Sequence, residues 1–261
     1  MRSLSIAATG MLAQQLNVDV ISNNIANMNT TGYKRRRAEF QDLLYQNLER
    51  VGSTTSDTGT IVPSGVQIGL GVKTSAVYMI AEQGALVSTS NTFDLAINGE
   101  GYFQITLPSG ETAYTRAGSF QLSPTGQIVT ADGYTVQPGI IIPSNVIGVT
   151  INPAGQVLVK QGGVVAETNV GQLQLASLPN AAGLQAIGDN LFLETAASGT
   201  ALTGTPGSAG FGKIVQNFLE TSNVNTVTEI TGLITAQRAF EMNSKVIQTA
   251  DEMLSTLTRM R

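Results

Sequence analysis

The sequence has none of three side chains on which much protein chemistry depends: its 261 residues include no His, no Cys and no Trp. The absence of His excludes a Ser-His-Asp triad and imidazole acid–base catalysis. The absence of Cys excludes disulfides, thiolate nucleophiles and iron–sulfur clusters. Charged residues make up only 12% of the chain, about half the usual share. This composition favours a surface largely covered by other protein over that of a free enzyme.

The chain also lacks the apolar run of about 18 residues or more that crosses a membrane as a helix. Met1 and Arg2 supply one positive charge, but the apolar stretch that follows is broken by Ser5, Thr9 and Gly10. It is not followed by a convincing small-residue cleavage site, so we expect no cleaved signal peptide. The length fits one or two domains, and the net charge is −4.

Heptad patterns are present at both ends. Near the N-terminus, one apolar row contains Leu4, Met11, Val18 and Ile25, and a second row contains Ala7, Ile21 and Met28. Near the C-terminus, the rows are Leu233, Phe240, Ile247 and Leu254, and Ala236, Ala250 and Leu257. This spacing predicts two amphipathic helices of about 30 residues, each with a narrow apolar seam.

Apolar stripes of this kind most often mark an ordinary packed helix within one domain. Here the two helices bracket the chain, and a lone helix of this length is marginal in water. We therefore expect the seams to meet each other or equivalent seams on neighbouring subunits. The predicted assembly interface comprises Leu4, Met11, Val18, Ile21, Ile25, Met28, Leu233, Phe240, Ile247, Leu254 and Leu257.

Several Asn residues precede Gly32, and both residue types tolerate the left-handed conformation that ends helices. A helix break is therefore expected near residues 29–32. The amphipathic stretch Phe40–Leu48 predicts one or two further helical turns, and the small polar residues 52–59 predict a linker or loop.

The middle of the chain has a β pattern. Phe93, Leu95 and Ile97 alternate with other residues, and turns of the Pro-x-Gly type recur at 107–110, 123–126 and 152–155. The predicted fold class is α+β, with long N- and C-terminal helices pairing as a coiled coil and a central, mainly antiparallel β domain. The predicted domains are a helical domain of residues 1–32 and 221–261, a connecting region of residues 33–72 and about 211–220 with an extended strut, and a β domain of residues 73–210.

No motif predicts an active site. The basic run Lys34–Arg37 lacks interleaved aromatic residues in a net acidic chain, so packing at a subunit contact is favoured over nucleic-acid binding. The Gly-rich stretches 65–71 and 207–212 match no nucleotide-binding motif. The β-region acids, including Asp94 and Glu100, lie beside turns, where acids are common. We predict no catalytic, cofactor-binding or metal-binding residues and no small-molecule substrate.

Three separate parts of the chain resemble the flagellar rod and hook family. Residues 22–34, SNNIANMNTTGYK, are similar to its N-terminal signature, in which the matching positions are Asn24, Ala26, Asn27, Thr31, Gly32, Tyr33 and Lys34. Residues 220–225 and 236–245 resemble its C-terminus, and residues 94–103 and 114–120 resemble its β-domain motifs. Total length and Leu43–Gly71 are most similar to the distal-rod branch.

The resemblance implies a non-enzymatic subunit that self-assembles into a helical tube and transmits torque from motor to hook. It implies paired terminal helices lining the tube, with the β domain outside. The implied partners are further copies of the chain, proximal rod proteins, the hook protein or its junction, the P- and L-ring proteins, a rod cap and the flagellar type III export apparatus. The implied location is the basal-body rod, which crosses the periplasm.

Two alternatives remain open at this point. A proximal rod protein would share most of the same motifs. A secreted β-rich binding module with coiled-coil ends would fit the heptads, but aromatic residues, the usual sugar platforms, are only 5% of the chain.

Overall fold

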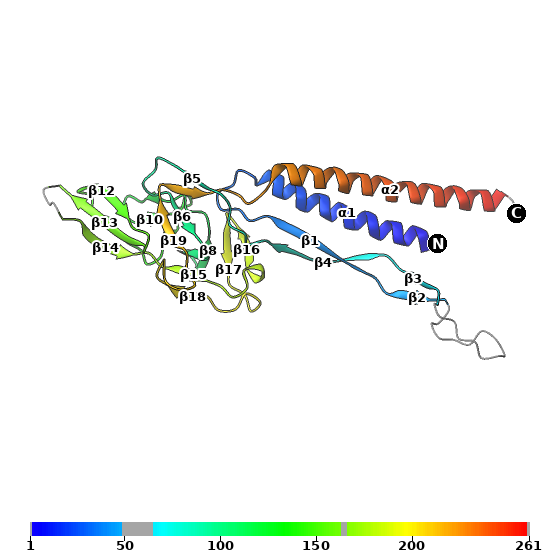
Figure 1. Ribbon diagram of the computed structural model, residues 1–261, viewed down its shortest axis with the longest axis horizontal. Helices are drawn as coiled ribbons and strands as arrows, with labels where there is room; N and C mark the ends of the chain where they lie inside the picture. Colours follow the sequence, from blue (N-terminus) through cyan, green and yellow to red (C-terminus); the bar gives the residue numbers. More distant parts are fainter. Residues whose placement is uncertain (1, 49–64, 163–165, 260–261) are drawn as a thin grey trace. The chain divides into compact units, whose positions relative to one another are not determined.

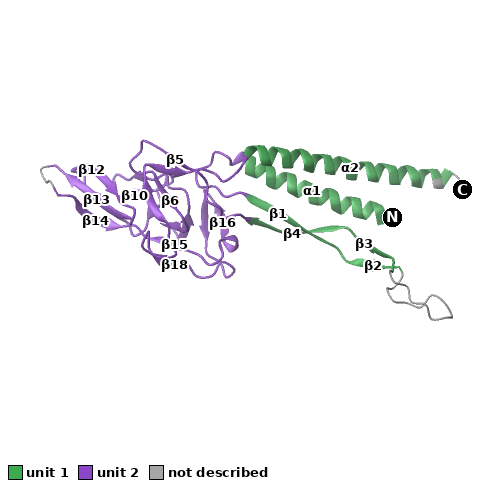
Figure 2. Ribbon diagram, viewed as in Figure 1, with its two compact units in different colours: residues 1–25, 36–78, 226–261 green, residues 26–35, 79–225 purple. Residues whose placement is uncertain are grey.

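A computed structural model describes residues 2–48, 65–162 and 166–259. The chain divides into two compact units (Figure 2). Unit 1 comprises residues 1–25, 36–78 and 226–261, and unit 2 comprises residues 26–35 and 79–225. The chain therefore passes between the units at four places. The architecture is α+β, as predicted, with a helix near each end and antiparallel strand pairing between them.

Unit 1 contains the two helices, α1 (Arg2–Ala26) and α2 (Thr226–Arg259). Glu229 lies in the first turn of α2 and Arg259 in its last, where each charge complements the helix dipole. Helix α1 ends at Ala26, just before the predicted break, and the turns that follow lead to Gly32 with φ of 69°. None of the helices in the described ranges is long and apolar enough to cross a membrane.

Two ribbons complete unit 1. Strand β1 (Arg36–Asp42) pairs with β4 (Val72–Met79), and β2 (Tyr45–Asn47) pairs antiparallel with β3 (Gln67–Gly69). The expected helical turns at Phe40–Leu48 are therefore wrong. Ala38 and Phe40 are the half-buried positions of β1 and their neighbours are exposed, so the period is two, as in a strand. Residues 49–64, which include most of the predicted strut and the polar linker, lie outside the described residues.

Unit 2 is built from antiparallel pairs. Its largest sheet runs in the order β16-β17-β8-β7-β11-β10-β9, with β15 pairing with both β7 and β18. These strands are β7 (Tyr102–Thr106), β8 (Thr112–Thr115), β9 (Gln121–Leu122), β10 (Ile128–Val129), β11 (Thr135–Val136), β15 (Leu175–Ser177), β16 (Gln185–Gly188), β17 (Leu191–Leu193) and β18 (Leu202–Gly204).

Smaller sheets and one short helix make up the rest of unit 2. One sheet contains β12 (Val146–Ile151), β13 (Gln156–Gln161) and β14 (Thr168–Gln172). Strand β5 (Leu86–Ser88) pairs with β20 (Phe218–Glu220), and β6 (Leu95–Asn98) pairs with β19 (Lys213–Gln216). The 3-10 helix η1 covers Ala181–Gly183. Strand pairing thus joins the first strands of unit 2, β5 and β6, to its last strands, β20 and β19.

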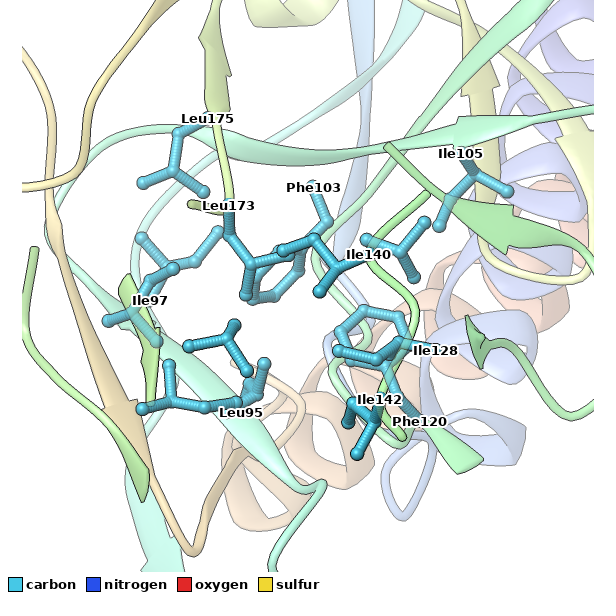
Figure 3. Close-up of a cluster of buried hydrophobic side chains, with 14 of the residues drawn as sticks. Leu95, Ile97, Phe103, Ile105, Phe120, Ile128, Ile140, Ile142, Leu173 and Leu175 are labelled. Carbon is cyan, nitrogen blue, oxygen red and sulfur yellow. The ribbon is translucent and has the colours of Figure 1, made fainter. Parts of the chain in front are cut away.

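The core of unit 2 is a cluster of aliphatic and aromatic side chains that point toward one another (Figure 3). Phe103 and Phe120 meet edge to face at its centre, with ring centroids 5.0 Å apart. Fully burying side chains of this size stabilises the fold by roughly 1.5–3 kcal/mol each. The three predicted Pro-x-Gly turns are confirmed, because Gly110, Gly126 and Gly155 all have positive φ.

Candidate assembly site

The two helices of unit 1 lie side by side and run antiparallel (Figure 1). Near the end of α1, Asn24 donates a hydrogen bond to the Glu229 carboxylate at 3.2 Å. Nearer its start, Gly10 lies against Asn243. Since Glu229 is in the first turn of α2 and Asn243 is near its middle, the helices point in opposite directions. The expected meeting of the two terminal helices is therefore observed within one chain.

The predicted seam residues differ in how far their side chains are exposed to solvent. Ile21 is buried, with 8% of its surface exposed. The other predicted residues of α1 and three of α2 are half-buried: Leu4, Met11, Val18, Ile25, Leu233, Ile247 and Leu254. The side chain of Leu257 lies outside the described part of the structure. The most completely buried apolar residues of the two helices are small, namely Ala7, Ala13, Ala236 and Ala250.

Helix α2 keeps much apolar surface that α1 does not cover. Phe240, a predicted seam residue, is 41% exposed. The other exposed apolar side chains of α2 are Val227, Ile230, Ile234, Met242, Val246 and Met253. A single helix pair offers only one apolar interface, whereas these side chains lie on several sides of α2. Within the single chain, the interface predicted from heptads is therefore only partly closed.

Asn24 joins α1 to the ribbon as well as to α2. Its amide oxygen accepts a hydrogen bond from the Arg36 backbone N–H at 2.9 Å, and its amide nitrogen donates one to the Arg36 carbonyl at 2.9 Å. Asn24 is only 1% exposed. This signature residue therefore fixes the start of β1 against the end of α1.

The remaining signature residues begin unit 2. Gly32 has φ of 69°, and a Cβ there would lie 2.7 Å from the backbone of Arg116 and Ala117. Both facts require glycine. The Gly32 N–H donates to the Glu220 carbonyl at 2.7 Å, and Thr31 accepts a hydrogen bond from Asn190 through its carbonyl. Two adjacent residues of the signature segment are thus bonded to the β region.

The other residues of this segment differ in exposure. Lys34 is buried, Thr31, Tyr33 and Asn27 are half-buried, and Ala26 is exposed. Met28, which the heptads place in the seam, is 38% exposed and belongs to unit 2, where the chain has already left the helix.

Lys34 forms a buried ion pair with Glu220. The ammonium is 2.5 Å from Oε1 of the carboxylate, and the two side chains are 1% and 0% exposed. Arg116 bonds the other oxygen, with its Nε at 2.9 Å and a terminal nitrogen at 2.8 Å. Gly84 donates its N–H to Oε1 at 2.9 Å. One carboxylate therefore joins residues from three distant parts of the chain.

The two cations at Glu220 have further acceptors. Lys34 donates to the Glu82 carbonyl at 2.7 Å, and Arg116 donates to the carbonyls of Gly99 and Gly101 at 2.9 and 2.6 Å. Burial lowers the pKa of the Lys34 ammonium, and the hydrogen bond and charge of Glu220 oppose that shift. Buried charges are tolerated only with such complete pairing. The cluster is therefore a structural joint rather than a reactive site.

Asn223 connects its own segment of the chain to the segments around Arg35 and Ile80. Its side-chain oxygen accepts from the Arg35 N–H at 2.7 Å, and its nitrogen donates to the carbonyls of Ile80 and Glu82 at 3.1 Å each. Along the chain, Arg35, Ile80 and Asn223 lie close to three of the four points at which it passes between the units. We call Lys34, Arg116, Glu220 and Asn223 the anchor cluster.

The sequence predicted only part of this site. Lys34 was recognised within a basic run and expected to pack at a subunit contact, but it pairs with Glu220 inside its own chain. Arg116 and Glu220 were not singled out, although both lie within the motifs that carried the resemblance. Glu220 ends strand β20, and Arg116 follows directly after strand β8. In the parts of the chain that the structure describes, no group of three acidic side chains is arranged to hold a metal.

Three family models match the chain, and together they define its class. The model "Flagella basal body rod protein" matches residues 4–34, the "Flagellar hook protein FlgE/F/G D1 domain" matches residues 96–159, and the "Flagellar basal body rod FlgEFG protein C-terminal" matches residues 215–260. The matched segments include α1, the sheet around β7 and α2. Together with the fold, these matches define the class as that of the flagellar rod and hook proteins.

Full-length relatives narrow the class. The flagellar basal-body rod protein FlgG of Caulobacter vibrioides is 62% identical over 100% of both chains. The protein of the same description from Agrobacterium fabrum is 54% identical over 99% of both chains. The one from Bacillus subtilis is 40% identical over 100% of this chain and 99% of the relative. The chain therefore belongs to the FlgG family of flagellar basal-body rod proteins. The predicted identity as a structural subunit of the distal rod is confirmed.

Proposed function

We propose that the chain self-assembles into a hollow helical tube that serves as the drive shaft between the motor and the hook. Its full-length similarity to rod proteins is the observation that carries this proposal. The apolar surface that α2 leaves exposed supports it, because neighbouring copies would bury side chains that one chain cannot. A heterologous contact repeated from copy to copy generates a helical assembly.

In this proposal the helical domain of residues 1–32 and 221–261 lines the tube, and its helices pair as a coiled coil. The assembly interface comprises the seam residues of both helices. Residues 33–72 and about 211–220 connect this domain to the β domain of residues 73–210, which lies outside. The strut within Leu43–Gly71 stiffens the tube by bracing neighbouring copies.

The proposed partners follow from the place of a distal rod within the rod and hook complex. Proximal rod proteins would adjoin one end, and the hook protein or its junction the other. The P- and L-ring proteins would surround the shaft, and a rod cap would guide its growth. Subunits would leave through the flagellar type III export apparatus without losing a signal peptide.

The experiment is complementation of a strain from which the gene has been deleted. We expect deletion to stop motility and to leave basal bodies with incomplete rods, and the full chain to restore both. A deletion strain that swims and completes its rods would contradict the proposed role. Mass spectrometry of the N-terminus of the exported chain tests the export route, since a shortened N-terminus would reveal cleavage.

A further inference from the structure

Three contacts between α1 and α2 all report one alignment. Gly10 lies against Asn243, Gly232 lies against Ile21, and Asn24 is bonded to Glu229. Each step toward the end of α1 is matched by an equal step toward the start of α2. The antiparallel register is therefore the same at the two ends of the contact and between them.

Two of these three contacts involve a polar side chain, one as a hydrogen bond and one as close packing against a glycine, and they are spaced alike on both helices. From Gly10 to Asn24 along α1, and from Glu229 to Asn243 along α2, the separation is two heptads. Asn24 and Glu229 are 1% and 8% exposed, so their hydrogen bond is buried. Asn243 fills the space above Gly10 so closely that a Cβ on Gly10 would lie 2.9 Å from Asn243 Nδ2.

We infer that these two contacts, which we call the register pins, select the alignment of the helix pair. An apolar seam with a heptad repeat fits nearly as well after a slip of one heptad, because apolar side chains again meet apolar side chains. A buried polar pair does not fit after such a slip, because each polar group left without its partner is desolvated with no compensating hydrogen bond. Polar residues in coiled-coil seams are known to determine register for this reason.

Of the two slips by one heptad, only one keeps Asn24 opposite helical residues of α2. Moving α1 by one heptad places Asn24 against Ala236, which has no side-chain acceptor and is 2% exposed. Glu229 then loses the Asn24 hydrogen bond, and Asn243 no longer faces the gap that Gly10 leaves. Both pins therefore fail together, while the apolar rows are still matched.

The selected register has a consequence beyond the helices. Asn24 also bonds the Arg36 backbone in both directions, so the alignment of α1 with α2 sets where strand β1 starts relative to α2. This inference concerns the choice among possible pairings within one chain and does not depend on the proposed tube.

Cysteine cross-linking tests the inference, because the chain has no cysteine of its own. Ile21→Cys with Gly232→Cys reports the observed register. Ile21→Cys with Ala239→Cys reports the slip of one heptad. Both reporters share the same change in α1, so differences between them reflect α2 alone. In the full-length protein, non-reducing gels separate closed single chains from cross-linked dimers.

Each reporter is compared in three backgrounds: the parent, Glu229→Leu with Asn243→Leu, and Glu229→Gln. The Leu changes remove both pins from α2 and leave the bonds between Asn24 and Arg36 in place. Glu229→Gln keeps a side-chain acceptor and is the matched control. We expect the slipped cross-link to stay at background in the parent and the control and to rise about fivefold or more in the Leu variant, since losing a penalty of 1 kcal/mol or more changes a population by that factor.

Two results would overturn the inference. One is a Leu variant that closes the native reporter as the parent does, with the slipped reporter still at background. The other is a Leu variant in which neither reporter closes, because the register pins would then hold the helices together instead of selecting their register.

Discussion

The carboxylate of Glu220 and the ammonium of Lys34 form an ion pair that is closed to solvent, although the residues come from opposite ends of the chain. Lys34 belongs to the segment that follows α1, and Glu220 ends β20, shortly before α2 begins. Since Arg116 of the β region bonds the same carboxylate, this one group connects the segment after α1 and the segment before α2 to the β region.

Replacing Glu220 by Gln should lower the free energy of unfolding of unit 2 by about 3–5 kcal/mol, because two buried cations would lose their counter-ion. Chemical denaturation followed by circular dichroism measures this. Glu82→Gln is the matched control. Its pair with Arg35 spans 3.6 Å, and the Glu82 side chain is 70% exposed, so the loss should stay below about 1 kcal/mol. Equal losses in the two variants would show that the anchor cluster has no special role.

A charge in the helix seam should prevent assembly while leaving unit 2 folded. Ile25→Asp or Phe240→Asp places a carboxylate where the proposed interface closes, at a cost of several kcal/mol if it stays unpaired. Sedimentation measures assembly, and the thermal transition of the β region reports folding. Lys245→Ala, on the exposed side of α2, is the control and should assemble normally. Polymerisation of both Asp variants would mean that the seam faces water.

Tyr102 should make the stability of unit 2 fall in alkaline solution. Burial raises the pKa of its hydroxyl above the ordinary 10.0, with the Arg116 charge opposing the shift. Above pH 10.0 the unfolded chain releases this proton while the folded chain retains it, so unfolding is favoured as pH rises through the window above 10.0. We expect Tyr102→Phe to flatten the decline measured by denaturation between pH 9 and 11. A slope unchanged by Tyr102→Phe would contradict this account.

Deleting about Val51–Pro63 should leave a polymer that forms but bends. These residues lie outside the described part of the structure, and the prediction rests on the similarity of Leu43–Gly71 to the distal-rod branch. Persistence length measured on electron micrographs is the test. Curved or flexible polymers would support the strut. Straight polymers as stiff as those of the full chain would rule it out.

Local patterns predicted the local structure well. The Pro-x-Gly turns formed because each needs only a preset φ and a glycine. The heptads predicted both helices because seam residues repeat within a single element. Phe40–Leu48 failed because three leucines in a short stretch fit either period, and strand pairing with residues about 30 positions away decided the outcome.

The anchor cluster could not be predicted in the same way. Lys34 reads as the first residue of an exposed basic run until Glu220, which is distant in sequence, is placed beside it. Asn24 likewise reads as one of several helix-ending asparagines, yet it bonds Glu229 and Arg36. Contacts of this kind depend on tertiary placement, which no spacing within one segment encodes.

Electron microscopy of the concentrated full-length protein tests the central claim most directly. The account predicts hollow helical tubes, because the apolar surface left on α2 is buried only by repeated copies. Discrete trimers or other closed oligomers at every concentration would contradict it.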